Sequence, residues 1–333
     1  MKGELKVLLY GAGDMAGKHA DAYQRLSTAR LVAVANRSPE RAEKLCRDFA
    51  IPRRYADLTE ALEKERPHIV SLCVPTAFHP EAAKKAFEAG AHVLSEKPIA
   101  LTAEEGMEMI ERAKKADRKL SVIFNRRFNT VWDELKRRMD SIGTPVVYNT
   151  QEIRSIRPKR AMHTRSLNNG PVVDCCVHDF DMLIHSLGKA KTVFASGTVF
   201  GSNKPFLTGI EDPAVDTAHI NVELEKGDRA YLFYGWGFPE GPGYWQHRDF
   251  MGPNGIVRLM GEFGHEVHHY REDGKLEVVY DLEENGHAVI VRRFVEAVLY
   301  DKEVPVKPED AVEALKISLA ALRSVESGEK ESV

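Results

Sequence analysis

The sequence predicts two domains of different class. The first is a doubly wound parallel α/β sheet, and the second is an α+β domain with a predominantly antiparallel open sheet and helices on one face. Three observations predict this. The 333 residues are enough for two domains. The first third alternates short apolar segments with amphipathic ones. After about residue 125, strand-like segments follow one another with little helix between them, so we expect domains at residues 1–125 and 126–333.

In the first domain, strands are expected where aliphatic residues cluster without alternation, as in strands covered on both faces. These strands are residues 7–10, 31–35, 69–74, 92–95 and 120–124. The helices between them are residues 15–26, 39–49, 58–65, 80–89 and 103–116. Ser38-Pro39 and Thr102 are typical of helix starts, and Gly90 is typical of a helix end.

In the second domain, Lys226-Gly227-Asp228, Pro253-Asn254-Gly255 and Asp273-Gly274 indicate hairpins. The expected strands are residues 146–153, 192–200, 217–224, 230–234, 256–260, 266–270 and 276–280. Helices at residues 131–139, 172–187, 288–299 and 309–325 should cover one face. The other face would remain apolar and bare, so we expect a homodimer or homotetramer formed through this sheet.

Composition and charge limit the classes of partner and the cellular location that we expect for this protein. The formal net charge is −3 without a long basic run, which favours neither nucleic acid nor an anionic membrane. No apolar run approaches the length of a membrane span, and residues 1–10 lack the layout of a signal peptide. Cys46, Cys73, Cys175 and Cys176 lack zinc or redox spacing. We therefore expect reduced thiols and a cytoplasmic protein.

A glycine turn follows the first expected strand. Gly11 permits the turn, Gly13 lets a pyrophosphate approach the backbone, and Ala16 allows close packing of helix and strand. The helix that starts here offers free N–H groups and a positive dipole end to the phosphate. The position of this turn between a strand and a helix predicts a dinucleotide site.

Charge at the end of the second expected strand bears on the cofactor. Enzymes that use NAD usually place Asp or Glu there, on the ribose 2′-hydroxyl. This chain has Asn36, Arg37 and Ser38 instead. Arg37 can pair with a 2′-phosphate and Ser38 can add a hydroxyl, which predicts NADP(H) over NAD(H). Alternatively, Arg37 only stacks on the adenine, which fits either cofactor.

Two segments carry residues suited to acid–base chemistry. Glu96-Lys97-Pro98 ends a strand at the edge where such sheets bind ligands, although an isolated Lys97 is more simply a solvated lysine. Asp174 and His178 are four residues apart on an expected helix, one turn above each other. Histidine can exchange a hydroxyl proton near neutral pH, and a carboxylate can support it. A solvated polar helix face is the simpler reading of the second segment taken alone.

Other clusters of polar and aromatic residues could have either a functional or a purely structural role. Zinc bound by His178, Asp181 and His185, or by His265, His268 and His269, is disfavoured by their spacing. Arg126 and Arg127 follow the last strand of the first domain, where one could contact substrate or form a salt bridge. Tyr244 and Trp245 lie in an expected loop and could stack on a sugar or fill a core.

Together these motifs resemble one family, that of glucose–fructose oxidoreductase, inositol dehydrogenase and the rhizopine catabolism protein (Gfo/Idh/MocA), over essentially the whole chain. The glycine turn followed by His19 is typical of it. So are His79, Ala86, residues 89–93 and Glu96-Lys97-Pro98, the run Asn125-Arg126-Arg127-Phe128, and Gly170, Asp174 and His178-Asp179-Phe180-Asp181. The chain departs from the family at Asn168-Asn169 and at Cys175-Cys176, where glycines are common, and this bears on substrate preference.

The resemblance implies a Rossmann domain, a C-terminal sheet domain, an active site between them and NAD(P)-linked redox chemistry. It makes Lys97, Asp174 and His178 the catalytic residues: His178 as acid–base, Lys97 on the reacting oxygen and Asp174 orienting the sugar. The expected cofactor-binding residues are Gly11, Gly13, Asp14, Met15, Ala16, Asn36, Arg37, Ser38, Pro75, Thr76, His79, Glu96 and Lys97. The expected substrate-binding residues are Lys97, Arg127, Asp174, His178, Tyr244 and Trp245, and no metal is expected.

The leading hypothesis is a cytoplasmic dehydrogenase or reductase that interconverts a secondary alcohol and a carbonyl on a sugar, an inositol-like polyol or a glycoside. A non-catalytic NAD(P)- or sugar-sensing protein is one alternative, but a sensor does not need Lys97, Asp174 and His178 together. A dihydrodiol-type dehydrogenase is the other.

Overall fold

The computed structural model describes residues 4–157, 159–201, 203–239, 245–260, 265–280 and 286–333. The chain divides into two compact units. Unit 1 combines Met1–Asn125 with Gly286–Val312, and unit 2 combines Arg126–Asn285 with Glu313–Val333. Gly286–Val312 belongs to unit 1, although the sequence interpretation included it in the second domain.

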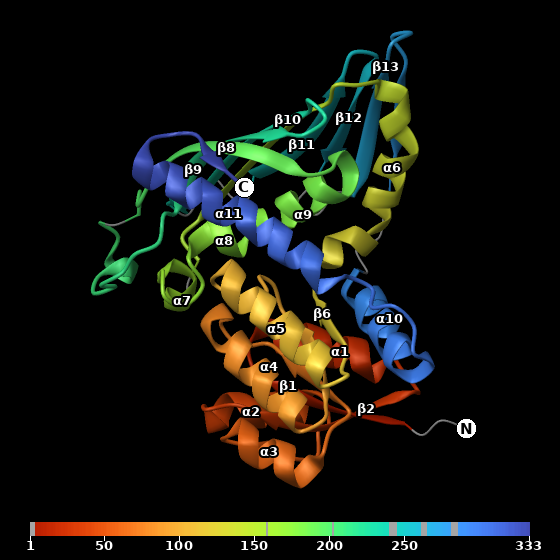
Figure 1. Cartoon of the computed structure of the whole chain (residues 1–333), viewed down its shortest axis with the longest axis vertical. Helices are drawn as coiled ribbons and strands as arrows, with labels where there is room; N and C mark the ends of the chain where they lie inside the picture. Colours follow the sequence, from red (N-terminus) through yellow and green to blue (C-terminus); the bar gives the residue numbers. More distant parts are fainter. Residues whose placement is uncertain (1–3, 158, 202, 240–244, 261–264, 281–285) are drawn as a thin grey trace. The chain divides into compact units, whose positions relative to one another are not determined.

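Unit 1 is built on a six-stranded parallel sheet with the order β3-β2-β1-β4-β5-β6 (Figure 1). The strands are β1 (Leu5–Tyr10), β2 (Ala29–Ala35), β3 (Arg54–Tyr55), β4 (Ile69–Leu72), β5 (His92–Ser95) and β6 (Leu120–Val122). The order reverses between β1 and β4, and ligands of doubly wound sheets bind outside the carboxyl ends of the strands at such a point. The predicted α/β class of the first domain is therefore confirmed.

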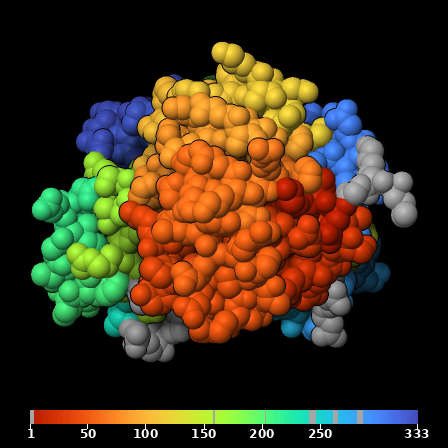
Figure 2. Space-filling model, turned by 90° about the horizontal axis from the view of Figure 1, so that it is seen from below, coloured from red at the N-terminus to blue at the C-terminus, as the bar shows by residue number. Residues whose placement is uncertain are grey.

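Helices connect these strands as the apolar periodicity predicts. They are α1 (Asp14–Gln24), α2 (Pro39–Asp48), α3 (Leu58–Glu65), the 3₁₀ turn η1 (Thr76–Phe78), α4 (His79–Glu88) and α5 (Ala103–Lys115). Ser38 and Thr102 cap α2 and α5 as expected, Thr102 in a full capping box with Glu105. Figure 2 shows this unit from below, with the residues coloured orange, which include α2 and α3, across the centre of the face.

Helix α10 (Gly286–Tyr300) corrects one expectation. It was expected to cover the antiparallel sheet, but it packs against α1 and β5 in unit 1. Its buried side chains include Ile290, Val291, Phe294 and Val295. The apolar stripe of α10 predicts a packed helix, but a stripe alone does not identify the surface that it packs on.

Unit 2 is built on a nine-stranded mixed sheet with the order β14-β13-β12-β11-β7-β10-β9-β8-β15. The strands are β7 (Val147–Ser155), β8 (Ala190–Thr198), β9 (Thr217–Leu224), β10 (Arg229–Phe238), β11 (Trp245–Gly252), β12 (Gly255–Met260), β13 (Glu266–Arg271), β14 (Leu276–Val279) and β15 (Glu331–Ser332). Only the β7–β10 pairing is parallel within the described residues. The predicted predominantly antiparallel class is confirmed.

Unit 2 departs from expectation in its helices and in its strands. Its helices are η2 (Asn125–Phe128), α6 (Thr130–Ile142), α7 (Arg160–His163), α8 (Gly170–Asp174), α9 (Cys176–Leu187), η3 (Pro205–Leu207) and α11 (Pro308–Ser327), the last beginning within the range of unit 1. The single helix expected over residues 172–187 is two, interrupted at Cys175. Strand β11 was not expected, because its charged residues hide it from a search for apolar segments.

One face of this sheet exposes large side chains on the described strands β8 and β10. Burial alternates along β9 and β10, and the large side chains of Phe194 on β8 and Tyr231 on β10 are 42% and 44% exposed. Both align with Asn221 of β9, which lies between them. The opposite face carries Tyr234 of β10, which donates to Asp179 of α9. None of the helices within the described residues combines the length and apolar character that a membrane span requires.

Candidate functional site

The glycine turn has the geometry of a phosphate cradle. Gly11 has a φ of +109°, and a Cβ there would lie 2.4 Å from the carbonyl oxygen of Cys73, so the fold itself requires glycine. Gly13 differs, because a Cβ would meet nothing within 4 Å. Gly13 is also the N-cap of α1 and supplies no side-chain cap. The start of α1 therefore combines open space with backbone N–H groups and a positive dipole end, which fits a pyrophosphate.

Lys97 follows β5, at the same edge of the sheet. The Glu96 carboxylate beside it accepts a hydrogen bond from the Lys97 N–H at 3.3 Å and contacts His19 Nε2 of α1 at 2.9 Å. His19 is fully buried and Glu96 is 5% exposed. Burial opposes the charge of His19, but Cys73 and Glu96 outweigh it and raise the pKa of His19 to about 10. Burial also opposes the charge of Glu96, yet His19 lowers the pKa of Glu96 to about 2.

Residues after β4 complete this edge of unit 1. Pro75 is half-buried and precedes η1, and Thr76 is 1% exposed. His79 is fully buried, and its two ring nitrogens each lie 3.0 Å from a carbonyl oxygen, those of Pro98 and Val74. The contribution of the His79 ring is therefore to hold the two loops, and its direct contact with a cofactor stays a prediction.

At the end of β2, the side chains expected near the cofactor ribose have partners of their own. Asn36 donates to the Ser38 carbonyl oxygen at 2.9 Å. The exposed Arg37 guanidinium lies 5.2 Å from the centroid of the Phe78 ring. Ser38 accepts from the Arg41 N–H and donates to the Glu40 carboxylate at 2.8 Å. Glu40 is a negative group that the sequence interpretation did not consider.

In unit 2, Asp174 ends α8 and His178 lies in the first turn of α9. They are 5% and 9% exposed, and Asn168 donates to Asp174 at 3.3 Å. Because the helix is interrupted at Cys175, the two residues do not lie on consecutive turns of one regular helix. Gly170, at the start of α8, has a φ of +68°, and a Cβ there would lie 2.6 Å from the Val215 carbonyl oxygen.

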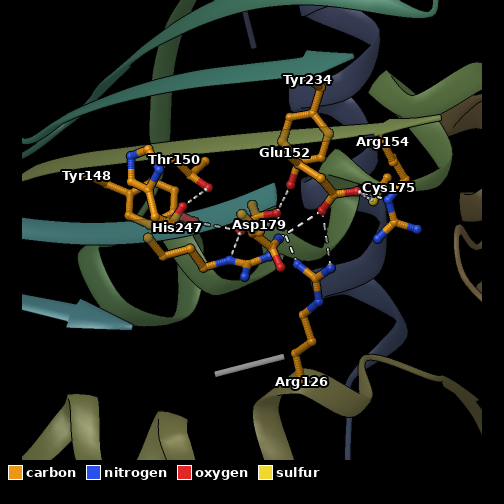
Figure 3. A network of polar contacts seen from close by, with 11 residues as sticks. Arg126, Tyr148, Thr150, Glu152, Arg154, Cys175, Asp179, Tyr234 and His247 are labelled. Atoms are coloured by element: carbon orange, nitrogen blue, oxygen red, sulfur yellow. Dashed lines mark hydrogen bonds and ion pairs between the residues drawn. The ribbon is translucent and has the colours of Figure 1, made fainter. Parts of the chain in front are cut away.

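A network of buried charged side chains contacts the helix at this interruption (Figure 3). The fully buried Asp179 accepts from Tyr148 at 2.6 Å, from Arg248 at 2.8 Å, from Arg126 at 3.1 Å and from Tyr234. Burial opposes its charge, but the nearby arginines hold the pKa of Asp179 well below its usual range. Glu152 of β7 accepts from the Cys175 thiol at 3.0 Å and from Gln246 at 2.8 Å. The carboxylates thus tie β7, β10 and β11 to the helix region that carries Asp174 and His178.

Sequence reasoning did not identify this network. A polar residue at every second position of β7 (Tyr148, Thr150, Glu152, Arg154) was the available signal, because alternate residues of a strand share one face. Arg126 of the expected pair joins the network, whereas Arg127 forks onto Asp181 with contacts of 2.8 and 2.5 Å. A substrate contact of Arg127 stays a prediction.

The remaining expectations concern metal and aromatic residues. Among the described residues, no group of three or more His, Cys, Asp or Glu side chains could hold a metal ion. His268 contacts Glu266 at 3.0 Å, and Asp181 is held by Arg127. Tyr244 lies outside the described residues. Trp245 begins β11 instead of lying in a loop, where it is aligned with Ile153 of β7.

Comparison with known proteins identifies the family. The family model described as "Oxidoreductase family, NAD-binding Rossmann fold" matches residues 5–124. The model "Oxidoreductase family, C-terminal alpha/beta domain" matches residues 138–333. The chain belongs to the Gfo/Idh/MocA oxidoreductase family. It is therefore an oxidoreductase with an NAD(P)-binding Rossmann domain, as the resemblance implied.

Similar members of the family are named dehydrogenases. The scyllo-inositol 2-dehydrogenase (NAD(+)) of Bacillus subtilis is 27% identical, with 98% of this chain and 96% of that protein covered. The D-glucoside 3-dehydrogenase of Escherichia coli is 31% identical over 68% of this chain and 69% of its own length. The structure of levoglucosan dehydrogenase in complex with NADH and levoglucosan has a TM-score of 0.88 at 19% identity, with 99% of both chains covered, which shows the same fold. These relatives favour an enzyme over the sensor and the dihydrodiol alternatives.

Proposed function

We propose that this oxidoreductase interconverts a secondary alcohol and a carbonyl on a sugar, an inositol-like polyol or a glycoside, with NAD(P) as the hydride carrier. The observation that supports this proposal is the open space beside Gly13 at the start of α1, at the same edge of the sheet as Lys97, whose N–H donates to Glu96. The names of the inositol and glucoside dehydrogenases support the substrate class. The four cysteines are free, which fits the proposed cytoplasmic location.

Three side chains are proposed to serve the reacting alcohol. His178 removes the hydroxyl proton during oxidation and returns it during reduction, because imidazole titrates near neutral pH. The Lys97 ammonium stabilises the negative charge that develops on that oxygen, and Asp174 accepts a hydrogen bond from a neighbouring hydroxyl of the substrate. The nicotinamide, when bound, supplies the hydride acceptor or donor. The cofactor would be held by the backbone at Gly11, Gly13, Asp14, Met15 and Ala16 and by residues at the ends of β2, β4 and β5.

A substrate panel tests this proposal. Inositols, hexoses, glycosides and diols would be offered with each cofactor, and turnover followed by the absorbance of the reduced nicotinamide. We expect turnover of a polyol or sugar, with kcat reduced about 10²–10⁴-fold in His178→Ala, the usual contribution of general acid–base catalysis. His185→Ala, on the same helix, is the control. Activity that survives His178→Ala unchanged would show that His178 is not the acid–base.

The proposed preference for NADP(H) over NAD(H) depends on the end of β2. Asn36 brings no carboxylate there, and the exposed Arg37 can pair with a 2′-phosphate. Glu40 opposes the preference, because its carboxylate accepts from Ser38, the hydroxyl expected to help bind that phosphate. The relative from Bacillus subtilis is named for NAD(+).

Dissociation constants for NADPH and NADH measure this balance. We expect tighter binding of NADPH by the wild type and a shift toward NADH in Arg37→Asp. Glu40→Gln should strengthen the binding of NADPH more than that of NADH, because it removes a negative charge beside the hydroxyl of Ser38. Equal constants for the two cofactors in the wild type would defeat the preference.

A further inference from the structure

The segment that carries Lys97 is anchored on both sides by buried histidines. On one side the Glu96 carboxylate contacts His19 Nε2 through Oε1, at 2.9 Å, and the Lys97 N–H through Oε2, at 3.3 Å. On the other side the His79 ring contacts the Pro98 carbonyl oxygen at 3.0 Å. The main chain of Lys97 thus lies between two residues whose polar groups are fixed from other elements of unit 1.

The His19 side of this anchor begins on α1. His19 lies in the second turn of the helix that starts at Asp14, directly after the phosphate cradle. Its other ring nitrogen, Nδ1, lies 2.7 Å from the Ser71 hydroxyl of β4, and Tyr23 donates to the same hydroxyl at 3.4 Å. All three side chains are fully or almost fully buried. The contact with Ser71 therefore fixes the orientation of the imidazole, whose Nε2 is then directed at Glu96.

Charge makes the Glu96 contact strong and directional. A protonated His19 donates to an ionised Glu96, and hydrogen bonds between ionised groups are about twice as strong as neutral ones. Because Glu96 is buried, water does not compete for its second oxygen, which remains directed at the Lys97 N–H. Any displacement of His19 is thereby transmitted through one carboxylate to the main chain of Lys97.

We propose that His19 and Glu96 are positioning residues for Lys97, and that the pair links the position of α1 to that of the lysine. The proposal rests on the proposed function in that Lys97 is taken to act on the reacting oxygen. Neither residue needs to touch the substrate. Their role is to hold the lysine main chain at a fixed place relative to the helix whose start receives the pyrophosphate.

Three variants and one control test the proposal. His19→Ala removes the donor to Glu96. His19→Gln keeps a neutral donor for Glu96. Glu96→Gln keeps the shape of the side chain but removes its charge. The control is His92→Gln, because His92 begins β5, the strand that Lys97 follows, and accepts from the Lys119 N–H at 2.9 Å. Each variant would be measured for kcat, substrate KM, free energy of unfolding in urea and amide hydrogen exchange at Lys97 by NMR.

We expect His19→Ala to lower kcat between about 10- and 100-fold with little change in KM, the size of effect that a misplaced catalytic group produces. Amide exchange at Lys97 should accelerate in the same variant. His19→Gln should recover most of kcat and of the exchange protection while remaining less stable than the wild type, because it restores the donor without the charge. His92→Gln should leave kcat and exchange at Lys97 unchanged.

A merely structural role predicts a different pattern. In that case kcat would follow the free energy of unfolding through the whole series, and His19→Gln would recover neither kcat nor the exchange protection at Lys97. Unchanged exchange at Lys97 in His19→Ala would overturn the proposal whatever the kinetics. If the wild type turns over no sugar or polyol, the proposed function fails, and the exchange measurement still decides whether His19 holds Lys97.

Discussion

Buried charge is the residue-scale property that most distinguishes this chain from an ordinary soluble core. Ionised side chains are almost never fully buried unless they are paired. Here His19 and Glu96 pair in unit 1, and Asp179 pairs with Arg248 and Arg126 in unit 2. Removing one partner of such a pair typically costs about 3–5 kcal/mol, because the other charge remains buried. The two pairs lie beside the residues proposed to act on substrate, Lys97 in one unit and His178 in the other.

The His19–Glu96 pair gives a testable pH dependence. The pKa of His19 is raised from 6.5 to about 10, so its stabilising contribution is complete below pH 6.5 and is lost as pH rises through about 10. The pKa of Glu96 is lowered from 4.5 to about 2, so its contribution is present above pH 4.5 and is lost as pH falls through about 2. The wild type should therefore exceed His19→Gln in free energy of unfolding most between pH 4.5 and 6.5.

Urea unfolding of both proteins across this range and toward pH 10 measures the difference. The margin should shrink as the pH rises. A margin that is constant from pH 4.5 to 10 would mean that His19 is neutral in the folded protein.

At the scale of elements, the strand–turn–helix unit at the start of the chain joins fold and function in one motif. Glycine is needed at its two positions for different physical reasons. Gly11 is required by the protein itself, because a side chain would collide with Cys73, whereas Gly13 faces open space and has an ordinary φ of −91°. The spacing of the glycines predicted the turn, but it could not separate these two reasons, because the neighbour of Gly11 is Cys73, directly after β4 and some sixty residues later in the chain.

Alanine at each glycine separates the two roles. Gly11→Ala should destabilise unit 1, by more than the roughly 1 kcal/mol typical of a residue forced into a disfavoured conformation, because it adds a backbone collision. Gly13→Ala should leave stability unchanged or raise it by up to about 1 kcal/mol, while weakening the binding of NADH and NADPH. Urea unfolding and fluorescence titration with the reduced cofactors provide the two measurements. Full cofactor affinity in Gly13→Ala would argue against a pyrophosphate at this turn.

The helical segment over residues 172–187 shows where the prediction of elements from local sequence fails. Apolar periodicity predicts one helix over residues 172–187, and the periodicity is real on both sides of Cys175. At the interruption the Cys175 thiol donates to Glu152 of β7, and Gly170, which has a positive φ, lies close to the Val215 carbonyl oxygen. Both partners are distant in sequence, so local pattern could not predict the interruption.

At the scale of the whole molecule, the exposed aromatic side chains on one face of the unit 2 sheet support the proposal that this chain forms a dimer or tetramer. Phe194 and Tyr231 lie on that face with nearly half of their surface exposed, flanking Asn221. Exposed aromatic side chains on an open sheet are costly in a monomer, and a second copy of the same face covers them symmetrically.

Charge reversal of that face tests the assembly. We expect the double variant Phe194→Lys, Tyr231→Lys to become monomeric, because each copy would bury two ammonium groups in the interface. Tyr300→Lys in α10 is the control, since Tyr300 is 55% exposed in unit 1. Light scattering after size-exclusion chromatography gives the mass of each protein. A wild type that is monomeric at all concentrations would remove the proposal.

The sequence by itself determined the two sheet classes, the glycine turn between β1 and α1 and the family, because these follow from local periodicity and from motifs within short segments. It did not determine which unit α10 joins, which partners hold Glu96 and Asp179, or where the helix between Asp174 and His178 breaks. These depend on contacts between residues far apart in the chain, such as His19 with Glu96 and Cys175 with Glu152. Only the folded backbone brings such groups within hydrogen-bonding distance, and burial then makes their charges interact strongly.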